Sequence, residues 1–148
     1  METIASENYQ AYDEGLGRSM WYTVKGDVTK VTEMVRSFPA DRHADLWRGV
    51  GIACSYVGGF DKEILDALVS ASAEHNVQLA IGAAMVAKSR IEAECITEDI
   101  ETSCHALCNT TAQQAMDITN RNKRVPNFSF SKFILDMYNE LSATKNIK

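Results

Sequence analysis

The sequence predicts an all-α protein of six to eight helices, arranged either as helix-pair repeats of the α-solenoid type or as an irregular helical bundle. Apolar residues recur at helical spacing along most of the 148 residues, whereas the alternating pattern of strands is nearly absent. Residues that cap helix N-termini precede several of these segments, and the chain has only two prolines. The length and the hydrophobic content of 45% suit one domain with its own core.

The N-terminal third is expected to form three helices. The first is predicted over residues 8–24. Asp27 can cap the second helix, because its carboxylate can accept a hydrogen bond from a free amide of the first turn, and Pro39 ends that helix. A third helix is expected from about residue 41 to residue 57, where two consecutive glycines stop it.

The middle of the chain is expected to form four further helices. Asp61 can cap the fourth, and Thr97 can cap the sixth. The fifth, from about residue 76 to residue 94, is rich in alanine and apolar on nearly all sides, so we expect it to be the most buried. Thr111 and Gln114 have the spacing of a capping box at the start of the seventh.

The C-terminal segment carries the clearest amphipathic pattern. After a basic stretch that ends at Pro126, apolar residues repeat along one helical face. We therefore treat residues 1–126 as one helical domain and residues 127–148 as an amphipathic helix that either caps this domain or docks onto a partner. The stripe consists of Phe130, Phe133, Ile134, Met137, Tyr138 and Leu141.

A faint repeat runs through the first 90 residues. Two Gly-x-Gly motifs, at residues 15–17 and 49–51, begin 34 residues apart (49 − 15), and Asp27 and Asp61 share this spacing. Gly82 follows Gly49 by 33 residues (82 − 49). Repeats of this length are typical of helix-pair arrays, although coincidence in an irregular bundle is the alternative. Neither motif has the third glycine or the preceding strand of a dinucleotide-binding loop, so both indicate close contacts between helices.

Charge and hydropathy exclude several partners. The net charge of −5 and the pI of about 5.2 argue against a nucleic-acid-binding protein. No apolar run approaches the ~20 residues that span a bilayer, and the acidic N-terminus does not resemble a signal peptide. We therefore expect a cytoplasmic protein with reduced cysteines and no membrane span.

The residue pattern predicts neither a metal site nor a cofactor. Cys104, His105 and Cys108, with Cys95 nearby, contain possible metal ligands, but no CxxC pair is present and His105 points away from Cys104 on a helix. Buried free cysteines are the better interpretation. An acidic group near residues 92–101 leaves a two-carboxylate metal or acid–base site open, beside the simpler interpretation of a solvated helix junction.

Arginines and large aromatic residues accompany the glycine-containing helices. In a helix-pair array these helices form the concave surface, where such side chains suit an unsaturated or anionic ligand or a partner peptide. The alternative is that the aromatic residues pack internally and the arginines form ion pairs. The candidate ligand- or partner-binding residues are Arg18, Trp21, Arg42, Trp47, Arg48 and Tyr56.

Four segments resemble a known family: residues 14–21, 38–59, 82–90 and 108–119. Together, over roughly residues 8 to 125, they resemble the C-terminal half of a bacterial family of unknown function. Its members are often encoded in gene clusters for enediyne polyketides and related natural products. Members of this family are about twice as long, so the resemblance leaves open a stand-alone half, a split subunit or an excised domain. A homo-oligomer or a partner that supplies the other half is among the expectations. The resemblance supplies no catalytic residues.

Two functions from different classes follow as expectations. The first is an accessory binding or scaffolding protein of natural-product biosynthesis, which holds a hydrophobic intermediate or a biosynthetic enzyme. The alternative is an enzyme that isomerises, cyclises or dehydrogenates a polyketide or polyene intermediate. An enzyme would need a pocket with converging titratable groups, and the sequence does not reveal one.

Overall fold

A computed structural model describes the backbone of residues 2–123 and 129–146, and these residues form helices and connecting turns with no strand. The predicted all-α class is confirmed. The predicted boundary between residues 126 and 127 lies outside the described residues. In chain order the elements are α1 (Glu2–Val24), α2 (Val28–Arg36), the 3₁₀ turn η1 (Ala40–Arg42), α3 (His43–Val57), α4 (Lys62–Ser72), the 3₁₀ turn η2 (Ala73–His75), α5 (Asn76–Glu92), α6 (Glu98–Ser103), the π-helical turn η3 (Cys104–Cys108), α7 (Ala112–Lys123) and α8 (Phe130–Asn146).

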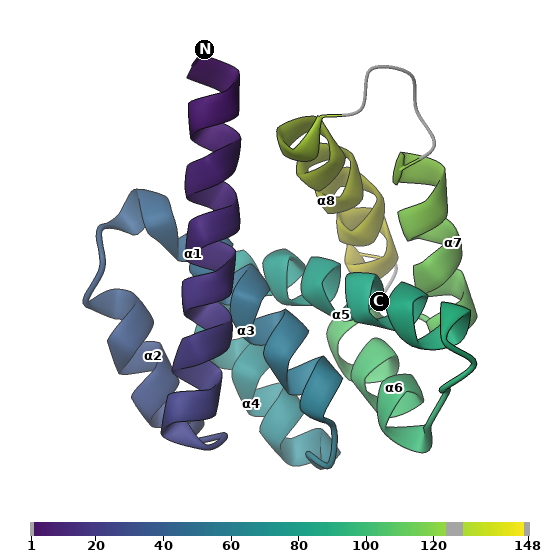
Figure 1. Ribbon diagram of the computed structural model, residues 1–148. Helices are drawn as coiled ribbons and strands as arrows, with labels where there is room; N and C mark the ends of the chain where they lie inside the picture. Colours follow the sequence, from purple (N-terminus) through teal and green to yellow (C-terminus); the bar gives the residue numbers. More distant parts are fainter. Residues whose placement is uncertain (1, 124–128, 147–148) are drawn as a thin grey trace.

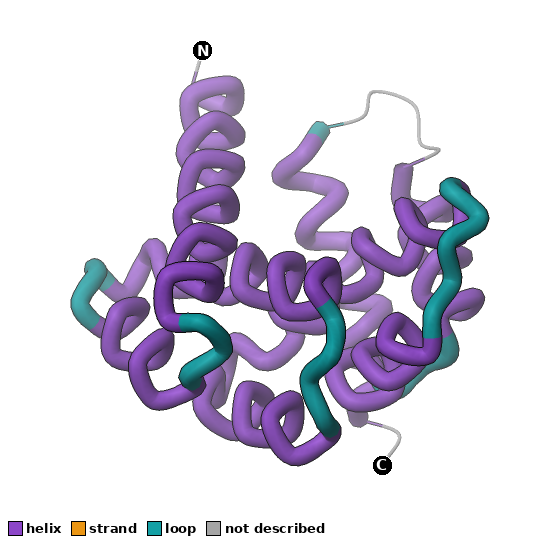
Figure 2. Tube along the Cα trace, turned by 60° about the horizontal axis from the view of Figure 1, so that its bottom comes forward, coloured by secondary structure: helices purple, strands orange, loops and turns teal. Residues whose placement is uncertain are grey.

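The helices form two rows, and α8 lies against one of them (Figure 1). Helices α1, α3, α5 and α7 contact one another in that order, and α2 and α4 pack beside them as a second row. Helix α8 contacts α5, α7 and α1, so the last helix folds back onto its own chain. The first turns of α1 project beyond the body of the molecule in both ribbon and tube views (Figures 1 and 2).

Most of the predicted helix caps are present. Asp27 accepts a hydrogen bond from the backbone amide of Lys30 at 3.0 Å, and Asp61 begins α4 in the same way. Thr111 and Gln114 exchange backbone-to-side-chain hydrogen bonds of 2.9 and 3.1 Å, which is the predicted capping box. Thr97 occupies the N-cap position of α6, but its side chain makes no capping hydrogen bond.

Helices α1 and α3 cross at a pair of glycines. A Cβ atom on Gly49 would overlap the backbone of Glu14 and Arg18 in α1. A Cβ atom on Gly17 would overlap the backbone of Leu46 in α3. Each helix therefore contributes one glycine, and the two backbones touch where no side chain separates them.

Helices α3 and α5 cross in the same way. A Cβ on Gly82 would lie 2.6 Å from backbone atoms of Arg48 and Ile52, and one on Gly51 would lie 2.5 Å from the carbonyl oxygen of Leu79. All of these positions follow those of the α1–α3 crossing by 33 or 34 residues. The predicted period is therefore a period of helix packing, although α8 closes over the array and makes the whole an irregular bundle.

The core follows these crossings. Ten residues of α5 are buried, from Val77 to Ala87, but α3 also has ten buried residues in a shorter helix, so α5 is not the most enclosed helix as expected. Most of the amphipathic stripe of α8 is also inside, where Phe133, Met137 and Leu141 are each at most 1% exposed, whereas Tyr138 is 37% exposed. At 25–30 cal/mol per Å² of buried apolar surface, such side chains each contribute about 1.5–3 kcal/mol.

Some element boundaries differ from expectation. The first helix begins at Glu2, six residues before the predicted start. The third helix begins at His43 after a 3₁₀ turn, and the fifth ends at Glu92. The segment after α6 continues as a π-helical turn that ends at Asn109, which adopts φ of 58°. In residues 2–123 and 129–146 no helix is both long and apolar enough to cross a bilayer.

Candidate functional site

Arg48, in the middle of α3, is the most enclosed of the predicted site residues. Its side chain is fully buried and forms ion pairs with Glu14 of α1 at 2.7 Å and with Asp45 at 2.9 Å. It also donates to the side-chain oxygen of Gln78 in α5 at 3.2 Å. The ring of Phe130 in α8 lies 5.5 Å from the guanidinium carbon. Arg48 thus links four helices and is not open to a ligand.

Arg42 forms the second ion pair of the same region. It donates two hydrogen bonds to the carboxylate of Asp13, at 2.6 and 3.1 Å, and its guanidinium stacks on Phe38. The hydrogen bond to Asp13 raises the pKa of Arg42. Asp13 precedes Glu14 in α1, so the two arginines reach neighbouring carboxylates and belong to one polar cluster.

One carboxyl of this cluster has a shifted pKa, and so does an imidazole that precedes α5. Burial raises the pKa of Asp45 more than the neighbouring Arg48 lowers it. Burial lowers the pKa of His75, and His43 adds to this effect from a ring 6.2 Å away. Shifted pKa values are typical of catalytic groups, and they also occur in structural ion-pair networks.

The remaining predicted site residues do not join the cluster. Trp21 is 1% exposed, with its ring edge-on to Phe60 at 5.2 Å, and Trp47 is buried as well. Tyr56 is half exposed at the end of α3, where Arg90 stacks on its ring at 4.3 Å. Arg18 is exposed on α1. The structure therefore brings together only Arg42 and Arg48, and binding by the six residues as one open face stays a prediction.

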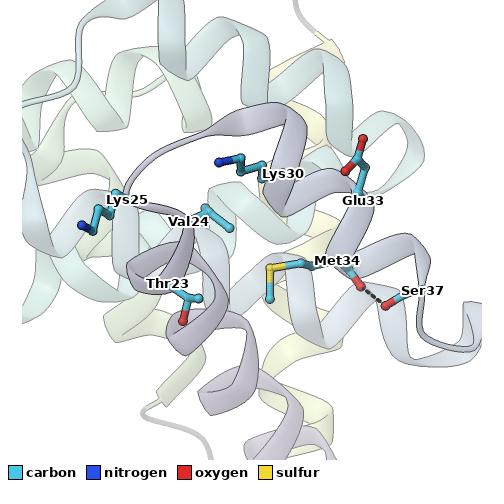
Figure 3. A pocket seen from close by; sticks show the side chains of 7 residues that line it. All are labelled: Thr23, Val24, Lys25, Lys30, Glu33, Met34 and Ser37. Atoms are coloured by element: carbon cyan, nitrogen blue, oxygen red, sulfur yellow. Dashed lines mark hydrogen bonds between the residues drawn. The ribbon is translucent and has the colours of Figure 1, made fainter.

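A surface hollow lies elsewhere, between the end of α1 and α2 (Figure 3). Its volume is about 660 Å³. The turn that links the two helices bends through Lys25 and Gly26, with φ of 55° and 81°. Figure 3 shows Lys25 at one end of the hollow and Ser37 at the other. The lining residues are Thr23, Val24, Lys25, Lys30, Glu33, Met34 and Ser37.

This lining combines two lysines, the acidic Glu33, two hydroxyl groups and two apolar side chains. Lys25 and Lys30 are exposed, and within the described residues neither forms an ion pair. Val24 lies between the two lysines, Met34 lies toward Ser37, and the ammonium group of Lys25 points away from both apolar side chains (Figure 3). Lys30 beside Val24 and Met34, with the longer-range charge of Lys25, suits a ligand with an acidic head and a hydrocarbon body. We call the hollow lined by these seven residues the α1–α2 groove.

Sequence reasoning did not find the α1–α2 groove. The available signal was Lys25 followed by Gly26 immediately before a helix cap, which marks a tight turn between two helices. Lysines at helix ends are common, so the pattern by itself did not distinguish a binding site from a solvated turn.

The cysteines are free, and three of them are buried. Cys108 donates to the carbonyl oxygen of Ala80 at 3.2 Å. A hydrogen bond with Cys108, together with burial, raises the pKa of Cys104, and burial raises the pKa of Cys54 to about 12. Among the described residues, no three His, Cys, Asp or Glu side chains meet in a way that could hold a metal ion. The thiols of Cys54 and Cys104 are therefore protonated at neutral pH and behave as small apolar groups.

Comparison with known proteins places the chain in a family. Residues 2–138 match the model of a family described as "Protein of unknown function (DUF1702)", and the chain belongs to that family. No curated protein and no solved structure matches the chain.

Proposed function

We propose that this chain is an accessory binding or scaffolding protein that works in the cytoplasm in natural-product biosynthesis of the enediyne polyketide type. Its task is to hold a hydrophobic intermediate or a biosynthetic enzyme. The biosynthetic setting comes from the family resemblance, and the binding role comes from the distribution of charge. Arg42 and Arg48 of the polar cluster are neutralised by carboxylates of the same chain, whereas the lysines of the α1–α2 groove have no ion-pair partner among the described residues.

The single observation that carries the binding role is the α1–α2 groove. Lys25 and Lys30 can form charge-assisted hydrogen bonds with a carboxylate or phosphate. Val24 and Met34 can cover part of an apolar chain attached to that group, and methionine adapts to ligands of differing shape. The ligand class that fits is therefore an unsaturated or aliphatic chain ending in an acidic group.

A fluorescent fatty acid tests this proposal. Parinaric acid is a conjugated tetraene carboxylic acid that fluoresces more strongly when it leaves water. We expect the protein to bind it, and the Lys25→Ala/Lys30→Ala double variant to bind about tenfold more weakly, because loss of charge-assisted hydrogen bonds costs about 1.5–3 kcal/mol.

Lys62→Ala is the matched control, because Lys62 pairs with Asp66 on the exposed surface of α4. It should leave binding unchanged. Absence of binding by the unmodified protein, or equal losses in all variants, would contradict the binding role of the groove.

The second candidate is an enzyme that acts on a polyketide or polyene intermediate. The observation that favours it is the raised pKa of Asp45 beside Arg48, with the His43–His75 pair at the start of α3 and α5. A raised pKa brings a carboxyl group closer to the range in which a general acid works. Production of the natural product in a strain carrying Asp45→Asn would distinguish the two candidates. A folded variant that abolishes the product supports the enzyme, whereas unchanged production contradicts it.

A further inference from the structure

We propose that the outward face of α1 around Gly15 is a self-association surface on which a second copy of this chain docks its own α1. This inference goes beyond the proposed function, because it uses neither the α1–α2 groove nor the buried ion pairs. It rests on the packing register that the chain repeats internally and on the one place where that register is left open.

Gly15 is equivalent in the repeat to two glycines that contact a neighbouring helix, but Gly15 itself has no such neighbour. Gly49 and Gly82 occupy the same position in the 34-residue period, and each receives the backbone of the preceding helix of the row. Gly15 has that position in α1, but a Cβ atom added there would meet no atom within 4 Å. The register used at two internal crossings therefore continues onto the open side of α1.

The surface around Gly15 is shaped to receive a helix. A hollow of about 400 Å³ lies there, lined by Ala11, Tyr12, Gly15, Leu16 and Ser19. Tyr12 is 66% exposed, and Leu16 is only partly covered. Small residues along a helix let a second backbone approach closely, and the flanking tyrosine and leucine would then be buried against it.

A second copy can supply what the internal crossings require. At each of them, both helices contribute one glycine: Gly17 with Gly49, and Gly51 with Gly82. The internal crossings pair the second glycine of one motif with the first glycine of the next. A contact between two α1 helices across a two-fold axis instead contributes the first glycine, Gly15, from each copy, so both helices again provide a glycine.

A head-to-tail array is not supported by the other end of the row. The exposed side chains of α7 are polar and large, so this helix offers no close approach to the Gly15 face of another copy. They include Gln113, Gln114, Asp117 and Arg121.

The charges favour α1 helices that run in opposite directions. Arg18 is exposed and has no ion-pair partner among the described residues. Arg18 and Tyr12 lie three residues to either side of Gly15, so an antiparallel crossing places Arg18 of one protomer against Tyr12 of the partner subunit. A guanidinium over a tyrosine ring is a favourable contact, and opposed helix dipoles add to it.

Sedimentation equilibrium of the full chain over the micromolar range tests this proposal. We expect a monomer–dimer equilibrium for the unmodified protein. Gly15→Leu should raise the dissociation constant by about tenfold or more, because its side chain would occupy the position of the partner helix. Arg18→Ala should raise it severalfold. Ser70→Leu, on the exposed surface of α4, is the control and should leave the dissociation constant unchanged.

The structure makes Gly15→Leu an informative variant, because the space beside Gly15 is empty in the single chain and the variant can fold. A melting temperature at least as high as that of the unmodified protein would verify this. A protein that stays monomeric throughout the concentration range would overturn the proposal. So would a dimer that Gly15→Leu leaves intact, because its interface would lie elsewhere.

Discussion

The two sides of α1 differ sharply although they carry the same short motif. On the inner side, Gly17 touches the backbone of Leu46, and Glu14 pairs with the buried Arg48. On the outer side, Gly15 faces open space, and Arg18 is exposed. The difference arises because the row of helices extends from α1 in only one direction. The Gly-x-Gly motif therefore permits close packing of helix backbones, but a close contact forms only where a neighbouring helix is present.

The largest effect should come from replacing the arginine on the inner side. Arg48→Met removes the cation that pairs with Glu14 and Asp45 and leaves both carboxylates partly buried. Breaking a buried ion pair on one side typically costs about 3–5 kcal/mol. We expect a loss of that size in the free energy of unfolding, measured by urea denaturation.

Arg18→Met, on the outer side of the same helix, is the matched comparison. It should change the free energy of unfolding by no more than about 0.5 kcal/mol, as surface substitutions usually do. Equal losses for Arg48→Met and Arg18→Met would show that the two sides of α1 do not differ in burial as described.

A smaller loss is expected at the glycine crossing. Gly17→Ala places a methyl group against the backbone of Leu46, so α1 and α3 must move apart. Overpacking of this kind costs about 1–3 kcal/mol even though alanine favours the helix more than glycine does. Thermal unfolding followed by circular dichroism would measure it. A Gly17→Ala variant with an unchanged melting temperature would contradict the close contact between the two backbones.

The helices could be predicted from the sequence because their signals are local. Asp27 and Asp61 indicate helix starts because an aspartate side chain can accept a hydrogen bond from the backbone amide three residues later. Both residues accept this bond in the structure. The 34-residue spacing of glycines was also visible and corresponds to the helix crossings. The early start of α1 at Glu2 was not, because the first residues lack a marked apolar face.

The candidate site was harder to predict because burial depends on distant elements. The sequence placed Arg48 and Trp47 beside glycines but could not show that α8 returns to lie against Arg48 through Phe130. The partners of the arginines were also unexpected. Arg42 pairs with Asp13, which lies 29 residues away in the sequence. Such pairs follow from how helices cross, which composition and spacing do not determine.

A glycine-to-alanine substitution on the outer side of α1 should stabilise the protein, whereas Gly17→Ala on the inner side should destabilise it. Gly15→Ala adds a methyl group where a Cβ meets nothing within 4 Å. Alanine in a helix interior is favoured over glycine by about 1 kcal/mol. We therefore expect a gain of about 0.5–1 kcal/mol in the free energy of unfolding, measured at protein concentrations low enough for the monomer to prevail. A destabilised Gly15→Ala variant would show that the outer side of α1 is already covered in the single chain.

The smallest expected effect is a pH dependence of the free energy of unfolding that involves His75. This residue precedes α5, and its ring lies 6.2 Å from that of His43. Burial lowers the pKa of His75 below the 6.5 of an unfolded histidine. Above pH 6.5 the imidazole is neutral in both states and contributes no pH dependence. As the pH falls through 6.5 the unfolded chain takes up the proton first, so the free energy of unfolding decreases until the folded pKa is reached.

Urea denaturation between pH 8 and pH 5 should show this decrease, and His75→Gln should remove part of it. His105→Gln, on the exposed side of the π-helical turn, is the control for losing a histidine. An unchanged slope of stability against pH in His75→Gln would contradict this prediction. It would mean that the imidazole of His75 is too exposed to couple folding to protonation, and that the start of α5 is more open to solvent than its packing indicates.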